Sequence, residues 1–492
     1  MNRILLATAF AIGASLSAHG ELKVYTAPQE AKMNDSFTVE VSQAGGAWQS
    51  VPVYNVMVDR VEEKHNVENS SMAYFDFSGD VNVRVISNHR PVETARVRPL
   101  SYNIVPSVSG DTLEFSLDRP RLLSVEVNDE IFDNLQLFAN PIDTDIPDAK
   151  RIAKSQKRKA KNENLKTKND NLIYFGPGYH KLDSTLVVGN NTEIYVAGGA
   201  YVDGKIEVRD ASDVKIHGRG MIYPSRAIGI YVMRSKNVSV EGVFTTQCAV
   251  GGSDGVDVNN VKVMSYYGWG DGFNVFASNN VHYDNLFART SDDCTTVYAT
   301  RKGFVGGCKN ILTENSVLWA DVAHPFMIGL HGSAKEIGVD APSDVIEDIV
   351  YRNIDVLDVK EKQIDYQGVF AITCGDNNIV RNVTFEDIRV EDFRQGKLFD
   401  IRMPWNQKYC AAPGMLIENV NFKDIYYNGD KSELSLIIGY DESRKIKGIH
   451  FDNLVINGVK ISDTMPGKPA WYKTGDMARI FIGEHVEDIT FK

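Results

Sequence analysis

Cysteine is scarce in this chain, and the few cysteines show no metal-binding pattern. Five occur in 492 residues: Cys248, Cys294, Cys308, Cys374 and Cys410. None has the spacing of paired zinc ligands, and the odd number leaves at least one without a partner within the chain. A bridge between Cys294 and Cys308 is one alternative, but buried free thiols are favoured. Cys294 lacks a clear histidine partner, which argues against a nucleophilic thiol.

Long apolar runs are also missing beyond the first residues. Residues 1–20 combine one early positive charge, a short apolar run and the small-residue site Ala18-His-Gly20, as in a bacterial secretory signal peptide. The run is too short for a membrane span, no later segment is long enough for one, and no cysteine follows it to take a lipid. The sequence therefore predicts a secreted or periplasmic protein with no membrane span.

Positive charge is in deficit as well. The formal net charge is −12, which argues against nucleic acid as a partner. The exception is a basic strap at residues 146–170, where nine lysines and arginines lie between Lys150 and Lys168. We interpret the strap as a solvated linker or exposed helix, and docking to an anionic glycan or lipid is the alternative.

No long helical periodicity interrupts the second part of the chain, and a repeat of short strands takes its place. Apolar strands opened by Asn-Val or a close variant start at Asn237, Asn260, Asn280, Asn310, Asp348, Asn382, Asn419 and Gly448. Such repetition, with β-branched and aromatic residues in the strands, is typical of a stacked solenoid. We predict a right-handed parallel β-helix over residues 171–492, with the asparagines forming ladders where the backbone turns.

The first part of the mature chain has a different pattern. Residues 21–145 contain short alternating runs such as Phe37-Thr-Val-Glu-Val41 and Val81-Asn-Val-Arg-Val85, separated by Gly, Asp, Pro and Asn turns. This alternation is typical of an antiparallel β-sandwich. The predicted fold class is therefore all-β, with an N-terminal β-sandwich that packs on the first coils of the parallel β-helix.

Three aspartates stand out within the repeat. Asp271 lies in Gly-Asp-Gly-Phe, and the adjacent Asp292 and Asp293 follow after 21 and 22 residues, close to one local repeat. In a β-helix this spacing places them on neighbouring coils about 4.8 Å apart. Adjacent residues on a strand face opposite sides, so the pair shares a cleft only if the chain bends there. Crowded carboxylates cannot all ionise cheaply, which suits acid–base chemistry on a sugar; an ordinary polar turn is the alternative.

The chain resembles two groups of parallel β-helix polysaccharide hydrolases, the dextranase type (glycoside hydrolase family 49) and the polygalacturonase type (family 28). The dextranase type also carries a β-sandwich before the helix, and the likeness includes Ala95-Arg-Val-Arg-Pro-Leu-Ser101 and Ile173-Tyr-Phe-Gly-Pro-Gly178. Asp271 resembles the first aspartate of the family's Thr-Asp-Gly motif, and Asp292-Asp293 resembles its paired aspartates. The resemblance implies inverting hydrolysis, with Asp292 as general acid and with Asp271 and Asp293 activating water.

Candidate substrate-binding residues lie near this cluster and one coil later. The segment Val317–Gly332 is similar to the one that closes the cleft floor in both families. We expect His324 to bind the substrate or tune Asp292, with His331 as a weaker candidate because a histidine in such a turn is more often structural. Stacking on sugar faces or internal packing is expected of Trp269, Trp319 and Trp405.

The predicted substrate depends on one departure from the polygalacturonase type. That type holds the uronic carboxylate with Arg-Ile-Lys, and the matching strand here, Gly368–Cys374, has no basic residue. A buried carboxylate without a cation is costly, so a neutral, dextran-like α-linked polysaccharide or oligosaccharide is favoured, although Arg402 from a later coil would partly restore the charge. The alternatives are a polygalacturonase-like hydrolase of pectic or other acidic polysaccharide, a Ca²⁺-dependent β-helix lyase, and a non-catalytic glycan-binding solenoid. No cofactor or metal is predicted.

Overall fold

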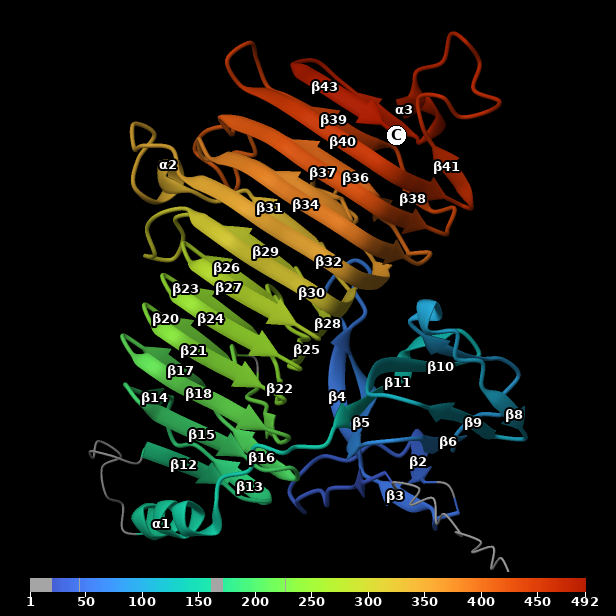
Figure 1. The fold of residues 1–492 in the computed structure, drawn as a ribbon, viewed down its shortest axis with the longest axis vertical. Helices are drawn as coiled ribbons and strands as arrows, with labels where there is room; N and C mark the ends of the chain where they lie inside the picture. Colours follow the sequence, from blue (N-terminus) through green and yellow to red (C-terminus); the bar gives the residue numbers. More distant parts are fainter. Residues whose placement is uncertain (1–19, 44, 161–170, 226) are drawn as a thin grey trace, which may run out of the picture.

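The computed structural model describes residues 20–492 except residues 44, 161–170 and 226. These residues form a long right-handed parallel β-helix with a β-sandwich beside its earlier coils (Figure 1). The predicted fold class is confirmed. Residues 1–19 of the predicted signal peptide lie outside the described residues.

Two sheets make the sandwich. The larger contains β1 (Leu22–Lys23), β5 (Val67–Phe77), β11 (Glu130–Pro141), β10 (Arg121–Val127) and β7 (Ala95–Arg98), with β4 (Val53–Asp59) also paired to β5. The smaller contains β3 (Gln49–Val51), β2 (Phe37–Ser42), β6 (Val81–Ser87), β9 (Thr112–Leu117) and β8 (Ser107–Ser109), and the 3-10 helix η1 (Leu100–Tyr102) follows β7. The pairs are antiparallel, as predicted, except that β5 and β11 run parallel.

Alternation along the strands explains the core of the sandwich. In β6, Val81, Val83 and Val85 are buried, and the residues between them are exposed or half-buried. Side chains on a strand point to opposite faces in turn, so one face of β6 is directed inward. These valines pack with Val39 and Leu113 of the neighbouring strands in one apolar cluster between the two sheets.

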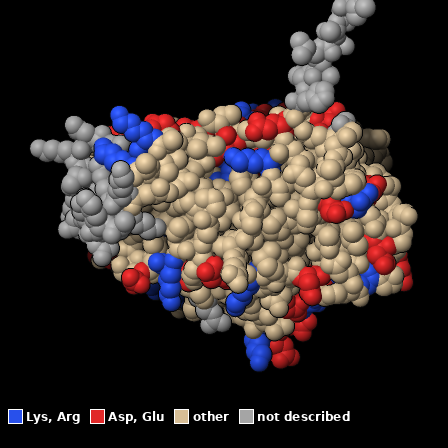
Figure 2. All heavy atoms as spheres, turned by 90° about the horizontal axis from the view of Figure 1, so that it is seen from below, with Lys and Arg blue, Asp and Glu red and all other residues tan. Residues whose placement is uncertain are grey.

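In the sequence, a helix connects the sandwich to the solenoid. The last sandwich strand ends at Pro141 and the first solenoid strand begins at Asn171. The helix α1 (Ala149–Ala160) occupies the first part of the basic strap, and residues 161–170 lie outside the described residues. Ile152 packs against Leu172 and Tyr195, so α1 docks on the first coil. Figure 2 shows this end of the molecule, where basic and acidic side chains are interspersed.

Two long sheets form most of the β-helix. The 11-stranded sheet contains, in order, β14 (Leu186–Val188), β17 (Ile206–Arg209), β20 (Ile230–Met233), β23 (Cys248–Gly251), β26 (Phe273–Phe276), β29 (Thr295–Tyr298), β31 (Phe326–Gly329), β33 (Phe370–Thr373), β36 (Phe399–Arg402), β39 (Ser435–Ile438) and β42 (Ile480–Ile482). Each strand pairs in parallel with the next, which stacks one coil on another.

The 19-stranded sheet winds around the rest of each coil. It contains β12 (Asn171–Phe175), β13 (Gly178–Lys181), β15 (Thr192–Val196), β16 (Ala200–Asp203), β18 (Ser212–Gly218), β19 (Met221–Ile222), β21 (Lys236–Glu241), β22 (Phe244–Thr245), β24 (Asp254–Asn259), β25 (Lys262–Met264), β27 (Asn279–Asp284), β28 (Phe287–Thr290), β30 (Cys308–Ala320), β32 (Val345–Val359), β34 (Ile379–Val390), β37 (Leu416–Tyr427), β40 (Lys445–Ile456), β41 (Val459–Ile461) and β43 (Val486–Phe491). The remaining elements are β35 (Gly396–Lys397) paired with β38 (Ser432–Glu433), the helices α2 (Ser333–Glu336) and α3 (Thr474–Met477), and the 3-10 helix η2 (Ile364–Tyr366). Among the described helices, none has the length and apolar character needed to cross a membrane.

Asparagine ladders mark the corners of the coils. Asn280 and Asn310 have positive φ values of 53° and 58°, a left-handed conformation that asparagine tolerates better than most residues. Nδ2 of Asn280 donates to Oδ1 of Asp254 (2.6 Å), and Nδ2 of Asn310 donates to Oδ1 of Asn280 (2.7 Å). The predicted ladder is therefore present, and it satisfies side-chain amides along the turn.

One predicted repeat start is wrong. The register aligns Val238 with Val256, so Gly255 occupies the ladder position of that coil in place of Asn260, and the neighbouring Asp254 supplies the acceptor for Asn280. Asn260 lies at a second corner, where Nδ2 of Asn285 donates to its Oδ1 (3.2 Å). The spacing misplaced Asn260 because two corners of each coil carry asparagine and the lengths of the coils vary.

The interior of the β-helix is a continuous apolar core. Phe385, Phe422, Phe451 and Phe491 stack on one another with ring centroids 5.1, 4.9 and 4.7 Å apart. Offset stacking of this kind adds to the free energy gained by burying the rings. All five cysteines are free and buried, in agreement with the prediction.

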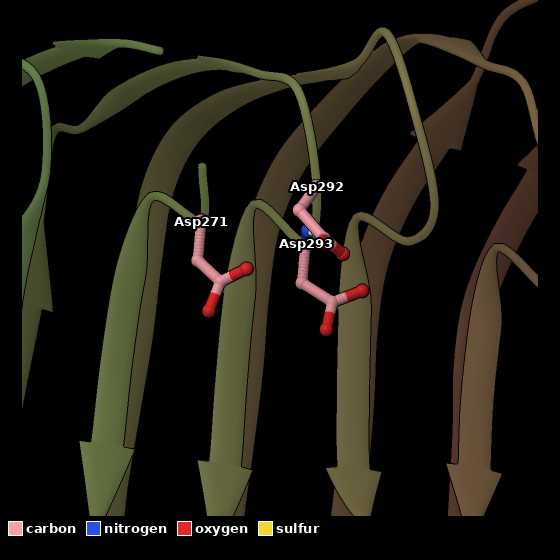
Figure 3. A group of neighbouring side chains, drawn as sticks. All are labelled: Asp271, Asp292 and Asp293. Carbon is pink, nitrogen blue, oxygen red and sulfur yellow. Dashed lines mark hydrogen bonds between the residues drawn. The ribbon is translucent and has the colours of Figure 1, made fainter. Parts of the chain in front are cut away.

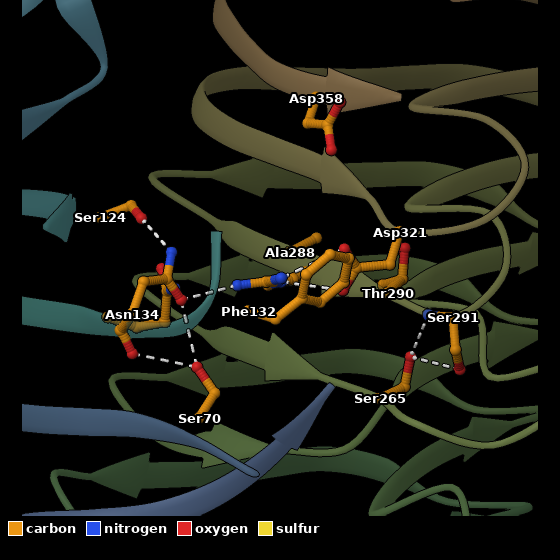
Figure 4. Close-up of polar contacts among 12 residues, drawn as sticks. Ser70, Ser124, Phe132, Asn134, Ser265, Ala288, Thr290, Ser291, Asp321 and Asp358 are labelled. Atoms are coloured by element: carbon orange, nitrogen blue, oxygen red, sulfur yellow. Dashed lines mark hydrogen bonds and ion pairs between the residues drawn. The ribbon is translucent and has the colours of Figure 1, made fainter. Parts of the chain in front are cut away.

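A buried ion pair of the solenoid holds an arginine that hydrogen-bonds to the sandwich. Arg289 on β28 and Asp321 after β30 are both fully buried, and Nε of Arg289 lies 2.8 Å from Oδ2 of Asp321. Nη1 of Arg289 donates to Oδ1 of Asn134 on β11 of the sandwich (2.9 Å). Ser70 and Ser124 hydrogen-bond the same asparagine (Figure 4). This network fixes β28, the strand that leads into the aspartate pair, against the sandwich.

Candidate active site

Asp271, Asp292 and Asp293 meet at one edge of the 11-stranded sheet. Asp271 lies in the turn between β25 and β26, and the adjacent pair lies between β28 and β29. One carboxylate oxygen from each of the three residues lies within 4.8 Å of the others. Figure 3 shows the three side chains directed to the same side of the coils. The juxtaposition expected from the repeat spacing is therefore present in the fold.

The chain bends at the aspartate pair, as its two adjacent side chains require. β28 ends at Thr290, whose Oγ1 donates to the carbonyl of Asp292 (2.7 Å). Oγ of Ser291 donates to the carbonyl of Tyr267 in the preceding coil (2.6 Å). A Cβ at Gly270 would collide with Oγ of Ser291, so glycine at this position lets the two turns approach closely.

Asp293 is buried and held by a histidine and a tyrosine. Its Oδ1 lies 2.6 Å from Nδ1 of His324, and its Oδ2 accepts a hydrogen bond from Oη of Tyr298 (2.8 Å). Nε2 of His324 lies 2.7 Å from the carbonyl of Tyr366. Burial lowers the pKa of His324, but Asp293, Glu361 and the carbonyl of Tyr366 together raise it, and the net shift is upward. Both ring nitrogens of His324 face acceptors, which favours the protonated ring. His324 therefore positions Asp293, whereas the sequence predicted that it binds the substrate or tunes Asp292.

Asp271 is half-buried and is oriented by an amide network. Nδ2 of Asn274 donates to its Oδ2 (2.6 Å) and to Oγ1 of Thr296 (2.9 Å), while Nε2 of Gln247 donates to Oδ1 of Asn274 (2.5 Å). Burial, followed by the neighbouring charge of Asp293, raises the pKa of Asp271 to about 7, although the Asn274 hydrogen bond opposes this shift. Asp271 therefore changes its protonation state near neutral pH.

Asp292 holds the proton of the cluster. Its Oδ1 accepts a hydrogen bond from the backbone N–H of Asp293 (3.1 Å). Burial, followed by the charges of Asp271 and Asp293, raises the pKa of Asp292 well above the ordinary range of an aspartate. Three close carboxylates cannot all carry a charge at low cost. The surroundings thus divide the cluster into a protonated Asp292 and an Asp293 that is held by His324 and Tyr298.

The three carboxylates open into a cleft with a volume of about 500 Å³. The cleft is also lined by His65, Trp269, Phe276, Tyr298, Arg301, Lys302, Val322, Ala323, His331, Glu361, Gln363, Tyr366, Lys408 and Tyr409. Aromatic rings suit the apolar faces of sugars, and the polar side chains suit their hydroxyl groups. The lining is therefore compatible with a sugar chain laid across the aspartates.

Trp269 and His331 are the predicted substrate-binding residues that line this cleft. Trp269 is 81% exposed, so its ring is free to stack on a sugar. His331 is buried in the wall of the cleft. Burial, with the charges of Arg301 and Lys302, lowers the pKa of His331 well below its ordinary value, and the ring is therefore neutral.

Three residues predicted to contact the substrate do not line the cleft. Trp319 is fully buried between the sandwich and the solenoid, where the guanidinium of Arg289 lies 4.1 Å from its ring centroid. The sequence could not show which face of β30 the sandwich covers. Arg402 does not line the cleft, because its Nε pairs with Oδ1 of Asp400 (2.7 Å). Trp405 is likewise not among the residues that line the cleft.

Several lining residues were missed by the sequence analysis. His65 comes from the sandwich, in the loop between β4 and β5, and its Nδ1 hydrogen-bonds to Oδ2 of the buried Asp59. No local pattern connects this loop with the aspartates, because the contact depends on how the two domains pack. Arg301 and Lys302 come shortly after β29, the strand that follows the aspartate pair. This position in the sequence could have indicated that they lie near the cleft. Lys408 follows β36 and carried no such signal.

Within the described ranges, the three aspartates are also the one group of potential ligands close enough to share a metal ion. Carboxylate oxygens suit hard cations such as Ca²⁺. In this structure, however, Tyr298 and His324 already hydrogen-bond the two oxygens of Asp293. The arrangement therefore favours proton transfer within the cluster.

Comparisons with known proteins show the fold of the chain. No protein-family model matches the sequence, and no curated protein matches it. Three of the similar solved structures are parallel β-helix hydrolases. They include Dex49A from Penicillium minioluteum (TM-score 0.60, 13% identity, 95% of this chain and 96% of that chain) and the family 28 exopolygalacturonase of Yersinia enterocolitica (0.48, 11%, 83% and 96%). The catalytic domain of a GH87 alpha-1,3-glucanase is a third (0.34, 11%, 84% and 89%).

Proposed function

We propose that this protein is a glycoside hydrolase that cleaves an α-linked polysaccharide by single displacement with inversion. The observation that supports the proposal is the division of the cluster into a protonated Asp292, an Asp293 paired with His324 and an Asp271 with a pKa of about 7. General acid–base catalysis needs one group that donates a proton and one that accepts it in the same cleft. The likeness to Dex49A supplies a compatible fold, while the reaction is argued from the site.

In the proposed reaction, Asp292 gives its proton to the glycosidic oxygen as the bond from that oxygen to the anomeric carbon breaks. A water molecule attacks the anomeric carbon from the opposite face, and Asp293 together with Asp271 accepts its proton. The new carbon–oxygen bond thus replaces the old one with inverted configuration. Proton exchange with solvent then restores Asp292 for the next cycle.

The compact spacing of the cluster bears on the stereochemistry. Carboxyl groups of most inverting pairs are about 6.5–9.5 Å apart, whereas the nearest oxygens of these three aspartates lie within 4.8 Å of one another. In the proposed mechanism, Asp271 and Asp293 hold the water jointly. Product stereochemistry therefore tests the mechanism independently of activity.

His324 and Tyr298 have positioning roles in this proposal. Both hydrogen-bond Asp293, and His324 is fixed in turn by the carbonyl of Tyr366. In this proposal, these contacts hold the Asp293 carboxyl group in place toward the water. We further propose that the enzyme is exported and acts outside the cytoplasm, on the basis of residues 1–20.

The cations that line the cleft bear on the charge of the substrate. The strand Phe370–Thr373 lacks basic residues, which was the reason for favouring a neutral, dextran-like glucan. Arg301, Lys302 and Lys408 nevertheless bring positive charge to the cleft from other elements. The lack of basic residues in this one strand therefore does not decide between a neutral and an acidic polysaccharide.

The proposed function is tested by exposing the purified protein to dextran, pullulan, pectins and algal polysaccharides. We expect new reducing ends from at least one α-linked polysaccharide, measured as reducing sugar over time. A product that absorbs in the near ultraviolet, and that disappears with a chelator, would establish a lyase instead. Binding to a polysaccharide without cleavage would establish a non-catalytic solenoid.

A further inference from the structure

We infer that the cleft contains a subsite for an anionic substituent of the sugar, a carboxylate or a sulfate ester, built by Arg301, Lys302 and Lys408. The inference rests on the proposed function, because it names the chemical class of substrate that the hydrolase would bind. All three side chains line the same cleft as the aspartates. Two come from the turn after β29, and the third comes from the loop after β36.

A tight turn presents Arg301 and Lys302 to the cleft. The backbone N–H groups of Arg301 and Phe304 each donate to the carbonyl of the other residue (2.9 Å), and Lys302 and Gly303 have φ values of 51° and 82°. These features are typical of a rigid two-residue turn. Lysine is an unusual residue at positive φ, where asparagine or glycine is common. Phe304 anchors the turn by stacking on Phe276, with parallel planes and centroids 6.4 Å apart.

Arg301 is held mainly by a neutral partner. Its Nη1 donates to Nδ1 of His331 (3.2 Å), whose pKa is lowered well below the ordinary value by burial and by the neighbouring cations. A carboxylate, Glu336, lies farther from Nη1, at 3.8 Å. A neutral imidazole orients the guanidinium without cancelling its charge, so Arg301 keeps most of its capacity to bind an anion.

The two lysines rest on aromatic rings. Nζ of Lys302 lies 5.3 Å from the ring centroid of Phe276, and Nζ of Lys408 lies 4.5 Å from that of Tyr409. A cation–π contact places an ammonium group and leaves its positive charge in the cleft. Within the part of the chain that the structure describes, neither lysine forms an ion pair.

Cations elsewhere on the solenoid are held differently. Nη2 of Arg381 lies 2.6 Å from Glu347, and Nε of Arg389 lies 2.7 Å from Asp355. The net charge of −12 means that carboxylates outnumber cations in the chain, so acidic partners are available for such pairs. Three cations that converge on a cleft with mainly neutral partners therefore indicate that an anion from outside the chain supplies the missing charge.

The position of Tyr298 relates this subsite to the aspartates. Its Oη donates to Asp293 (2.8 Å), and its ring meets His331 edge-on with centroids 4.9 Å apart. A sugar seated over Tyr298 thus has the acid–base group on one side and the cations on the other. This places the anionic substituent on a sugar next to the cleaved bond.

An alternative role for the cations is purely electrostatic. Lys302 and Arg301 act to lower the pKa of Asp271, against the larger upward effects of burial and of Asp293. That influence would be the same for every substrate. A role in substrate recognition would instead affect charged sugars and spare neutral ones, which gives the two roles different experimental outcomes.

The experiment measures binding without turnover, in the full chain with the substitution Asp292→Asn. Calorimetric titration uses an oligogalacturonate and its carboxyl-reduced counterpart, and a sulfated isomalto-oligosaccharide with its unsulfated counterpart. We expect Lys302→Gln and Lys408→Gln each to weaken binding of an anionic ligand about tenfold and of its neutral counterpart less than about twofold. Lys423→Gln on β37, an exposed lysine that does not line the cleft, is the matched control. The two arms distinguish a carboxylate from a sulfate.

The ionic strength gives a second readout, since added NaCl should weaken anionic binding less in the lysine variants than in their parent. Equal losses for charged and neutral ligands, or no preference for either anionic ligand over its neutral counterpart, would overturn the subsite. If a polysaccharide is cleaved but the substitutions do not discriminate by charge, the hydrolase stands without the subsite. If anions bind through the lysines and nothing is cleaved, the subsite stands without the hydrolase.

Discussion

Asp292→Asn is expected to lower kcat on the polysaccharide by about 10²–10⁴-fold, because an amide cannot give a proton to the leaving oxygen. The loss should be much smaller on an aryl α-glycoside of the same sugar, whose leaving group departs without protonation. The fold should be retained: the pKa of Asp292 is raised well above its ordinary range, so a neutral isostere removes no favourable charge at pH 7. Initial rates on the two substrates, with thermal unfolding alongside, measure these effects.

Asp183→Asn is the matched control, since it makes the same change at an exposed aspartate outside the cleft. The pH profile adds an independent readout. Activity requires protonated Asp292, so kcat/KM is present below the raised pKa of that residue and is lost as the pH rises through it. This alkaline limb should disappear in Asp292→Asn. Equal losses on both substrates, or an unchanged alkaline limb, would assign the proton to another group.

Arg289→Met is expected to lower the free energy of unfolding by about 3 kcal/mol, at the lower end of the range for breaking one side of a buried ion pair. The substitution leaves Asp321 fully buried without its bidentate partner. It also removes the hydrogen bond to Asn134 and the stacking on Trp319. Arg394 still approaches Asp321, with Nη2 3.2 Å from Oδ1, and limits the loss. The midpoint of urea unfolding measures the effect.

The double substitution Arg289→Met with Asp321→Leu separates charge from packing. Removing both buried charges should recover most of the lost stability, because replacing a whole buried pair with apolar residues is often neutral. Arg394 would keep its ion pair with Asp358. A double variant as unstable as the single one would show that the loss does not come from the unpaired charge of Asp321.

The sequence predicted the features that depend on local periodicity. The repeat of apolar strands predicted the solenoid, and a spacing close to one coil placed Asp271 beside Asp292 and Asp293. The bend between the pair followed from the alternation of side chains along a strand. Asn260 was misassigned because a coil turns at more than one asparagine corner.

Features that depend on how domains and loops pack could not be predicted in this way. Trp319 looked suitable for sugar stacking, but the sandwich covers its face of the solenoid. His65 reaches the cleft from a loop more than 200 residues before the aspartates. Lys408 converges with Lys302 only through the winding of the coils. The charge of the cleft was therefore underestimated when it was judged from the strand at Phe370.

The anomeric configuration of the first product tests the assigned roles most directly. The measurement follows hydrolysis of an α-linked substrate by proton NMR at early times, before mutarotation mixes the anomers. If Asp292 protonates the leaving oxygen while Asp271 and Asp293 activate water, the β-anomer should appear first and the α-anomer should follow. Initial release of the α-anomer would contradict single displacement, and it would require one of the aspartates to form a covalent bond to the sugar.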